Sequence, residues 1–236
     1  MTRSRLLLIT AFLIVAAVCV RLGVWQLDRL HERRASNAVA AAARSAPVAL
    51  LTGSYDDSNL VNRRVRARGR YDHTHDIVLR GQVYRGVPGV EIVSPLVLAD
   101  DANTAVLVNR GFVPAPDAMT IDPTRLQSLG NQQVEGIALP VDTVGGVPLR
   151  RGAVTTWARL DRNALEAQLS YKVYPFYIQQ LPDSSATPFP RRLDPPALDD
   201  GPHLNYAIQW FAFAAMALVF AGIMARLKRG NHPAAR

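Results

Sequence analysis

The residues best suited to ligand chemistry are a histidine and two aromatic residues that follow one another at helical spacing. Tyr206 lies three positions after His203, and Trp210 lies four positions after Tyr206, so on one continuous helix the three side chains share a face. An imidazole can ligate haem iron, and flat aromatic rings can line a porphyrin. The pattern therefore predicts either an axial haem ligand or a polar histidine at a wet membrane boundary, and the residues alone leave both open.

The remaining polar side chains form no catalytic or metal-binding pattern. His73 and His75 have no cysteine or third histidine near them in the sequence, so we expect a solvated turn instead of a metal site. One cysteine, Cys19, and four unclustered methionines offer too few soft ligands for Cu(I). The sequence contains no zinc-protease, nucleophile-elbow, phosphate-loop or dinucleotide motif. We therefore expect a protein that is not an enzyme.

Arginines alternate with small or apolar residues over Arg64–Tyr71, which predicts a strand. Side chains on a strand point to its two faces in turn, so four arginines would share one face: Arg64, Arg66, Arg68 and Arg70. Such a face is either solvated or an interaction surface for anionic lipid, a partner subunit or propionate groups.

The net charge is concentrated at the ends of the chain. The 236 residues carry a formal charge of +8, which would suit nucleic acid if it covered a domain. All 19 acidic residues, however, lie between Asp28 and Asp200, together with 20 of the 27 lysines and arginines. The other seven basic residues lie toward the ends, near the most apolar segments. This distribution is typical of a membrane protein and argues against nucleic acid as a partner.

Two segments predict membrane-spanning helices. Leu6–Val20 is apolar, and its continuation to Trp25 supplies the length a bilayer requires, because 15 residues rise only ~22 Å. No small-residue cleavage site precedes a polar segment, so we expect an uncleaved anchor and not a signal peptide. Tyr206–Ala225 is uncharged over 20 residues. Three small residues of this second segment either form a row on which another helix packs or merely fill the span. They are Ala217, Ala221 and Ala225.

The basic residues at both ends predict the orientation in the membrane. Positively charged flanks stay in the cytoplasm, so we expect both termini there and the intervening domain on the other side. A connection of roughly 180 residues translocates largely regardless of its own charges. We expect a multi-pass protein of the bacterial inner membrane, in contact with membrane lipid.

The segment between the spans predicts one β-rich domain. Residues 28–44 lack glycine and proline and should extend the first helix until Pro47. Runs rich in β-branched residues then predict further strands at Ile77–Leu79, Val90–Leu98, Ala105–Val108, Val134–Val141, Val154–Trp157 and Tyr174–Leu181. Turn residues are expected between strands at Gly86–Gly89, Asp100–Asn103 and Gly145–Gly146. A short helix is predicted at Asp161–Leu169, capped by Asp161.

The predicted fold is therefore a mostly antiparallel α+β domain flanked by two transmembrane helices. Its five parts are an N-terminal transmembrane helix (residues 1–27), an extracytoplasmic β-rich domain (28–183), a proline-rich linker (184–203), a C-terminal transmembrane helix (204–227) and a basic cytoplasmic tail (228–236).

Four short blocks carry a family resemblance. Leu22–Leu30 (LGVWQLDRL) is similar to L-G-x-W-Q-L-x-R-L, and Gly86–Leu96 (GVPGVEIVSPL) is similar to a block that begins with glycine and ends in T-P-L. Leu107–Pro114 (LVNRGFVP) is similar to L-V-N-R-G-W-V-P, and His203–Phe211 (HLNYAIQWF) matches H-L-x-Y-A-x-Q-W-F. In this order and at this spacing, the blocks resemble the Surfeit locus protein 1 family of cytochrome c oxidase assembly factors.

The resemblance implies a biogenesis factor for haem-copper oxidase that holds haem a and assists its insertion into the catalytic subunit. Oxidase subunits would be its partners, and the histidine that heads the second span, His203, would ligate the haem iron. The chain departs from the family pattern at Phe112, where tryptophan is usual, and at Gly201, where asparagine is common. An alternative function is a scaffold that clamps oxidase subunits without touching the cofactor, through the arginine face and the alanine row.

Overall fold

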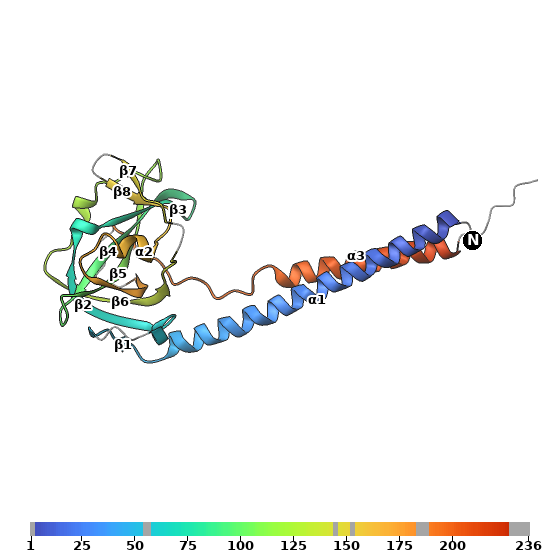
Figure 1. Ribbon diagram of the computed structural model, residues 1–236, viewed down its shortest axis with the longest axis horizontal. Helices are drawn as coiled ribbons and strands as arrows, with labels where there is room; N and C mark the ends of the chain where they lie inside the picture. The colour runs from blue at the N-terminus through green and yellow to red at the C-terminus, as the bar shows by residue number, and fades with distance from the viewer. Residues whose placement is uncertain (1–2, 54–57, 144–145, 152–153, 183–188, 227–236) are drawn as a thin grey trace, which may run out of the picture. The chain divides into compact units, whose positions relative to one another are not determined.

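The computed structural model describes residues 3–53, 58–143, 146–151, 154–182 and 189–226. They form two compact units (Figure 1). One unit contains the described residues of the ranges 1–39 and 198–236 and is helical; the other contains those of the range 40–197 and is β-rich. A β-rich domain between two apolar helices was predicted, and this arrangement is confirmed. The predicted limits of the membrane segments stay predictions, because they depend on where a bilayer lies.

Within the described residues, two helices meet the length and composition required to cross a membrane. Helix α1 is continuous over Arg3–Ser45, as the absence of glycine and proline from residues 28–44 predicted. It ends two residues before Pro47, because the residue preceding a proline disfavours the helical conformation. Helix α3 covers His203–Arg226 and includes the whole predicted second span.

A continuous seam joins α1 to α3. Buried and half-buried residues on α1 recur at alternating intervals of four and three: Arg5, Ile9, Phe12, Ala16, Cys19, Gly23, Gln26 and Leu30. The corresponding row on α3 has the same intervals: His203, Ala207, Trp210, Ala214, Ala217, Ala221 and Met224. This 3.5-residue repeat is the signature of a coiled coil. Most of the buried seam residues are small, which allows the two backbones to approach closely.

The contacts along the seam show that the two helices are antiparallel, and Figure 1 shows them lying side by side. The rings of Phe12 and Phe220 stack with centroids 5.7 Å apart, near the start of α1 and the end of α3. Farther along α1, a Cβ on Gly23 would lie only 2.7 Å from the ring of Phe211, near the start of α3. A larger side chain at this position would have to displace the Phe211 ring, so glycine allows the close approach of the two helices.

The predicted alanine row is correct in part. Ala217 and Ala221 are buried in the seam, but Ala225 is exposed, and the row continues through Ala214 and Ala207 instead. Residues spaced strictly four apart are displaced by about 40° around the helix at each step, so such a row leaves the contact surface after two steps. Alternating intervals of four and three follow the partner helix.

The second unit is built on one nine-stranded sheet. Its strands are β1 (Ala49–Leu50), β2 (Arg64–Tyr71), β3 (Ile77–Tyr84), β4 (Val87–Leu98), β5 (Thr104–Pro114), β6 (Asn131–Pro140), β7 (Leu149–Arg151), β8 (Val154–Trp157) and β9 (Lys172–Gln180). They lie in the order β1-β2-β6-β9-β5-β4-β3-β8-β7. Most neighbouring strands are antiparallel, as predicted; the parallel pairs are β1–β2, β3–β8 and β5–β9.

An additional pairing closes part of the sheet into a barrel. The end of β2 pairs with the end of β4, so β2, β6, β9, β5 and β4 form a ring. Alternate residues of all five strands point into it and form the largest core cluster, which includes Val65, Leu96, Val108, Ala138 and Phe176. Closure also pairs the ends of β2 and β4, whose backbone groups would otherwise be free to pair with other chains.

The shorter elements agree with local sequence signals except at one turn. Helix α2 (Arg162–Glu166) begins at Asp161, whose side chain accepts a hydrogen bond from the Ala164 N–H at 3.2 Å, although α2 is shorter than predicted. The turn expected at Gly86–Gly89 is confined to Arg85 and Gly86, which both have positive φ, and Val87 already begins β4. Two such residues between paired strands make a hairpin turn that needs no further loop. The expected turn at Asp100–Asn103 is confirmed; Gly145 of the last predicted turn lies outside the described residues.

The proline-rich segment starts as part of the β-rich unit. Within its described residues, Arg191 exchanges two backbone hydrogen bonds with Phe112 of β5, at 2.7 and 2.8 Å. The Gln179 amide donates to the carbonyl of Asp194 at 2.6 Å. These contacts fasten residues 191–194 to β5 and β9.

Candidate functional site

His203 is the first residue of α3 and faces α1 across the seam. Its Nδ1 lies 2.9 Å from Oε1 of Gln26. An amide oxygen only accepts hydrogen bonds, so Nδ1 carries the proton and the lone pair of the neutral ring lies on Nε2. Among the described residues, none is hydrogen-bonded to Nε2. The imidazole is therefore held by one nitrogen and offers the other to a ligand.

A groove of about 550 Å³ lies beside this ring, within the helical unit. It is lined by Arg29, Glu32, Arg33, Ser36, Asp199, Gly201, Pro202 and His203. Its volume falls within the range of small-molecule and cofactor sites, roughly 300–1,000 Å³. Gly201 has a φ of +66°, in the region that glycine and asparagine adopt most readily, so the change from the asparagine common in the family keeps this backbone geometry.

Charged side chains of both signs surround the groove. Arg33 donates to the carbonyl of Asp199 at 3.1 Å and lies 3.8 Å from its carboxylate, and Arg29 pairs with Glu32. Arg34, one residue farther along α1, pairs with Asp200 at 2.8 Å. All these side chains are exposed, and exposed ion pairs exchange partners at little energetic cost, about 0–1 kcal/mol. An anionic ligand could therefore take over the guanidinium groups at the edge of the groove.

The two aromatic residues predicted beside His203 do not line this groove. Trp210 is half-buried in the seam, two helical turns from His203, and its ring contacts Phe213 edge-on at 5.9 Å between centroids. Tyr206 points away from the seam and is 47% exposed. Their role in cofactor binding stays a prediction.

Gln26 is the functional candidate that the sequence pattern did not single out. It lies 177 positions from His203 and belongs to the block Leu22–Leu30, to which we assigned no chemistry. The sequence does contain a signal for it. Gln26 is the next position in the row Ala16, Cys19 and Gly23, and an amide in such an apolar row requires a polar partner.

The four predicted arginines do lie on one face of β2, but their charge is partly neutralised there. The antiparallel pairing with β6 places Glu135 opposite Arg66, and Glu135 binds both Arg64 and Arg66, at 2.5 and 2.7 Å. Arg68 donates to Gln133 at 2.8 Å. The hydrogen bond from Arg66 and the charges of both arginines lower the pKa of Glu135. Among the described residues, Arg70 is therefore the one arginine of this face without a cross-strand partner. Because the other three are paired, the face would attract anions less strongly than its sequence implies.

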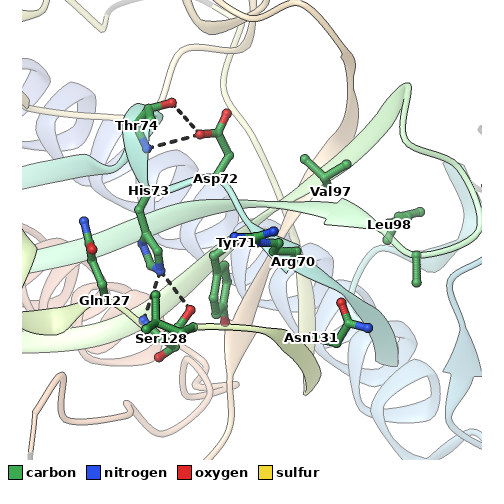
Figure 2. A pocket seen from close by; sticks show the side chains of 12 residues that line it. Arg70, Tyr71, Asp72, His73, Thr74, Val97, Leu98, Gln127, Ser128 and Asn131 are labelled. Carbon is green, nitrogen blue, oxygen red and sulfur yellow. Dashed lines mark hydrogen bonds between the residues drawn. The ribbon is translucent and has the colours of Figure 1, made fainter.

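A second hollow, of about 770 Å³, lies on the β-rich unit, and Figure 2 shows His73 and Ser128 meeting at its wall. Nδ1 of His73 lies 2.9 Å from the Asp76 carboxylate, so it carries a proton, and Nε2 of the neutral ring accepts the Ser128 N–H at 3.0 Å. The prediction of a solvated turn is correct for His75, which is half-exposed, and wrong for His73, whose side chain is only 11% exposed. Both ring nitrogens of His73 are occupied, and the described residues contain no group of three metal-binding side chains.

The block Leu107–Pro114 has a structural explanation. Arg110 is the extra residue of a β-bulge, because Asn109 pairs with Val93 while Gly111 pairs with Ile92. The bulge turns Arg110 inward, where it is 6% exposed, donates to the Ser128 hydroxyl at 2.9 Å and lies over the ring of Tyr71. Burial lowers the pKa of Arg110, and it raises the pKa of Tyr71 to about 12.

Asn109 and Gly111 complete this arrangement. The Asn109 side chain accepts the Gly111 N–H at 3.0 Å and donates to Glu91 at 2.6 Å. Gly111 has a φ of +124°, and a Cβ there would lie 2.1 Å from the carbonyl oxygen of Arg191. The asparagine, arginine and glycine of this block therefore build the barrel and fasten the proline-rich segment to it.

Comparison with known proteins relates most of the chain to one family. The SURF1 family profile matches residues 13–215. A SURF1-like protein of Monosiga brevicollis is 28% identical over an alignment of 241 positions, which covers 96% of this chain and 90% of the relative. A SURF1-like protein of Rickettsia felis is 26% identical, covering 91% and 95%. Surfeit locus protein 1 of Takifugu rubripes is 26% identical over 147 residues, which cover 56% of this chain and 61% of the relative.

The matched region contains all four sequence blocks, the seam residues from Ala16 on α1 to Ala214 on α3, and both partners of the hydrogen bond between Gln26 and His203. SURF1 proteins are known in general as cytochrome oxidase assembly factors and not as catalysts. The length of this match shows that the chain belongs to the SURF1 family.

Proposed function

We propose that this protein assists cytochrome oxidase biogenesis by holding haem a at His203 and passing it to the catalytic subunit. In this proposal α1 and α3 span a bacterial inner membrane, both termini are cytoplasmic, and the β-rich domain lies on the other side. The single observation that carries the proposal is the hydrogen bonding of His203: Nδ1 is bound to Gln26, no described residue is hydrogen-bonded to Nε2, and His203 lines a groove.

The residues of the groove fit a haem in two respects. A neutral imidazole nitrogen whose partner nitrogen is hydrogen-bonded is the usual form of a histidine that ligates iron. Arg29 and Arg33 at the edge of the groove offer guanidinium groups that can pair with carboxylates such as the propionates of a haem. When bound, haem a would supply an iron that the imidazole of His203 could ligate.

The number of available ligands favours transient binding. Among the described residues of α1 and α3, the other histidine is His31, which is exposed and does not line the groove. One protein ligand at an exposed groove would hold a cofactor less firmly than two ligands in a closed cavity. Such a site suits a protein that must release its cargo to a partner, and oxidase subunits are the partners we propose.

The test is the haem content of the full chain purified in detergent from cells that make haem a. We expect haem a in the wild type and in His31→Ala, and at least a tenfold lower occupancy in His203→Ala. His31 is the matched control because it is an exposed histidine on the same helix pair. Equal and very low haem content in the wild type and in His203→Ala would overturn the proposal.

The same preparations also test the alternative that the protein is only a scaffold. A scaffold that uses the arginine face should lose co-purifying oxidase when Arg68 and Arg70 are replaced by glutamate, whereas His203→Ala should leave it. The neutralisation of Arg64 and Arg66 by Glu135 makes this alternative the weaker one.

A further inference from the structure

We propose that Gln26 is a positioning residue for haem binding: its amide oxygen fixes the protonation and orientation of the His203 ring, so that Nε2 faces the ligand. This inference rests on the proposed function, and it adds a residue on a different helix to the site. The hydrogen bond of 2.9 Å between Nδ1 and Oε1 is the observation on which it is built.

The surroundings of Gln26 leave its amide little freedom. Gln26 is half-buried at a seam position of α1, directly across from His203 at the start of α3. One helical turn earlier, Gly23 lies against the ring of Phe211, and this contact restricts sliding of the two helices along each other. Two rigid elements therefore hold the donor and the acceptor, and a histidine held in this way needs no rearrangement before it binds a metal.

The chemistry of the acceptor determines how strongly the imidazole binds. A hydrogen bond from Nδ1–H makes Nε2 a better ligand, and a carboxylate acceptor does so more strongly than a neutral amide. An amide thus orients the ring while keeping its basicity moderate. This combination suits a site that must bind a haem and then release it.

The test compares haem binding by Gln26→Leu and Gln26→Glu, in the full chain in detergent, with ferric protoporphyrin IX as the probe. Gln26→Leu removes the acceptor, and we expect a 10- to 100-fold weaker affinity, the usual effect of losing a partner of a metal ligand. Gln26→Glu keeps an acceptor and strengthens it, so we expect affinity at least equal to wild type and a lower midpoint potential of the bound haem. Gln209→Leu is the matched control, because Gln209 is an exposed glutamine on α3.

A double-mutant comparison separates positioning from packing. If Gln26 acts through His203, Gln26→Leu should have no further effect on probe affinity in the His203→Ala background. An effect of equal size in both backgrounds, or unchanged affinity and potential in Gln26→Leu, would overturn this inference. If His203→Ala itself bound the probe as tightly as wild type, the proposed function would fail first, so the two failures are distinguishable.

Discussion

Replacement of Gly111 by alanine tests whether the contact between β5 and the proline-rich segment stabilises the β-rich unit. Gly111 has a φ of +124°, and its Cα is so close to the proline-rich segment that a Cβ would overlap the Arg191 carbonyl, at 2.1 Å. Alanine in the left-handed region costs about 1–2 kcal/mol. Displacing residue 191 would also weaken two backbone hydrogen bonds with Phe112, each contributing about 0.5–1.5 kcal/mol. We expect the free energy of unfolding to fall by about 2–4 kcal/mol.

The control for this variant is Gly130→Ala. Gly130 also has a positive φ, +76°, but a Cβ there would meet no atom within 4 Å, so this variant measures backbone strain without the overlap. Unfolding of the full chain in detergent can be followed by urea titration, with the fluorescence of Trp157, which is 2% exposed in the β-rich unit, as the probe. If Gly111→Ala costs no more than Gly130→Ala, the close contact with Arg191 does not stabilise the fold and the reasoning is refuted.

Three further variants test other parts of the structure. Ala214→Leu should overfill the seam and lower the thermal stability of the helix pair, whereas Ala215→Leu, its exposed neighbour, should not; equal stability would contradict the seam. Asp161→Ala should destabilise the β-rich unit by about 1 kcal/mol in urea titrations, because α2 loses its cap; an unchanged midpoint would refute the capping role. The arginines lower the pKa of Glu135, so its ionised carboxylate stabilises the folded protein. Relative to Glu135→Gln, this stabilisation should be less than about 1 kcal/mol, complete above pH ~5, and lost as the pH falls through the lowered pKa. A pH-independent difference would contradict the ion pair with Arg66.

The sequence predicts those parts of the fold that local physics decides. The long apolar runs predict both helices, because each residue contributes to a periodic or uniform pattern over many turns. The alternation of Arg64–Tyr71 predicts β2 with the correct face outward, and Asp161 predicts the start of α2. In each case the signal and the structure it specifies lie within a few residues of one another.

The remaining features depend on contacts between distant segments. The parallel pairing of β5 with β9 and the closure of β2 onto β4 follow from packing of the whole barrel, and no residue marks them. The bulge at Arg110 lies in the part of β5 beyond Val108, where the predicted strand ended. The partner of His203 is on the other helix: the seam interval marks Gln26 as a polar residue in an apolar row, but the sequence does not show that it pairs with His203.

The most direct test of the central claim is the resonance Raman spectrum of the full chain loaded with ferrous haem a. Ligation of the iron by His203 predicts an iron–nitrogen stretching band that shifts to lower frequency when histidine is labelled with ¹⁵N and that is absent from His203→Ala. An identical, label-sensitive band in His203→Ala, or a wild-type spectrum without such a band, would contradict it.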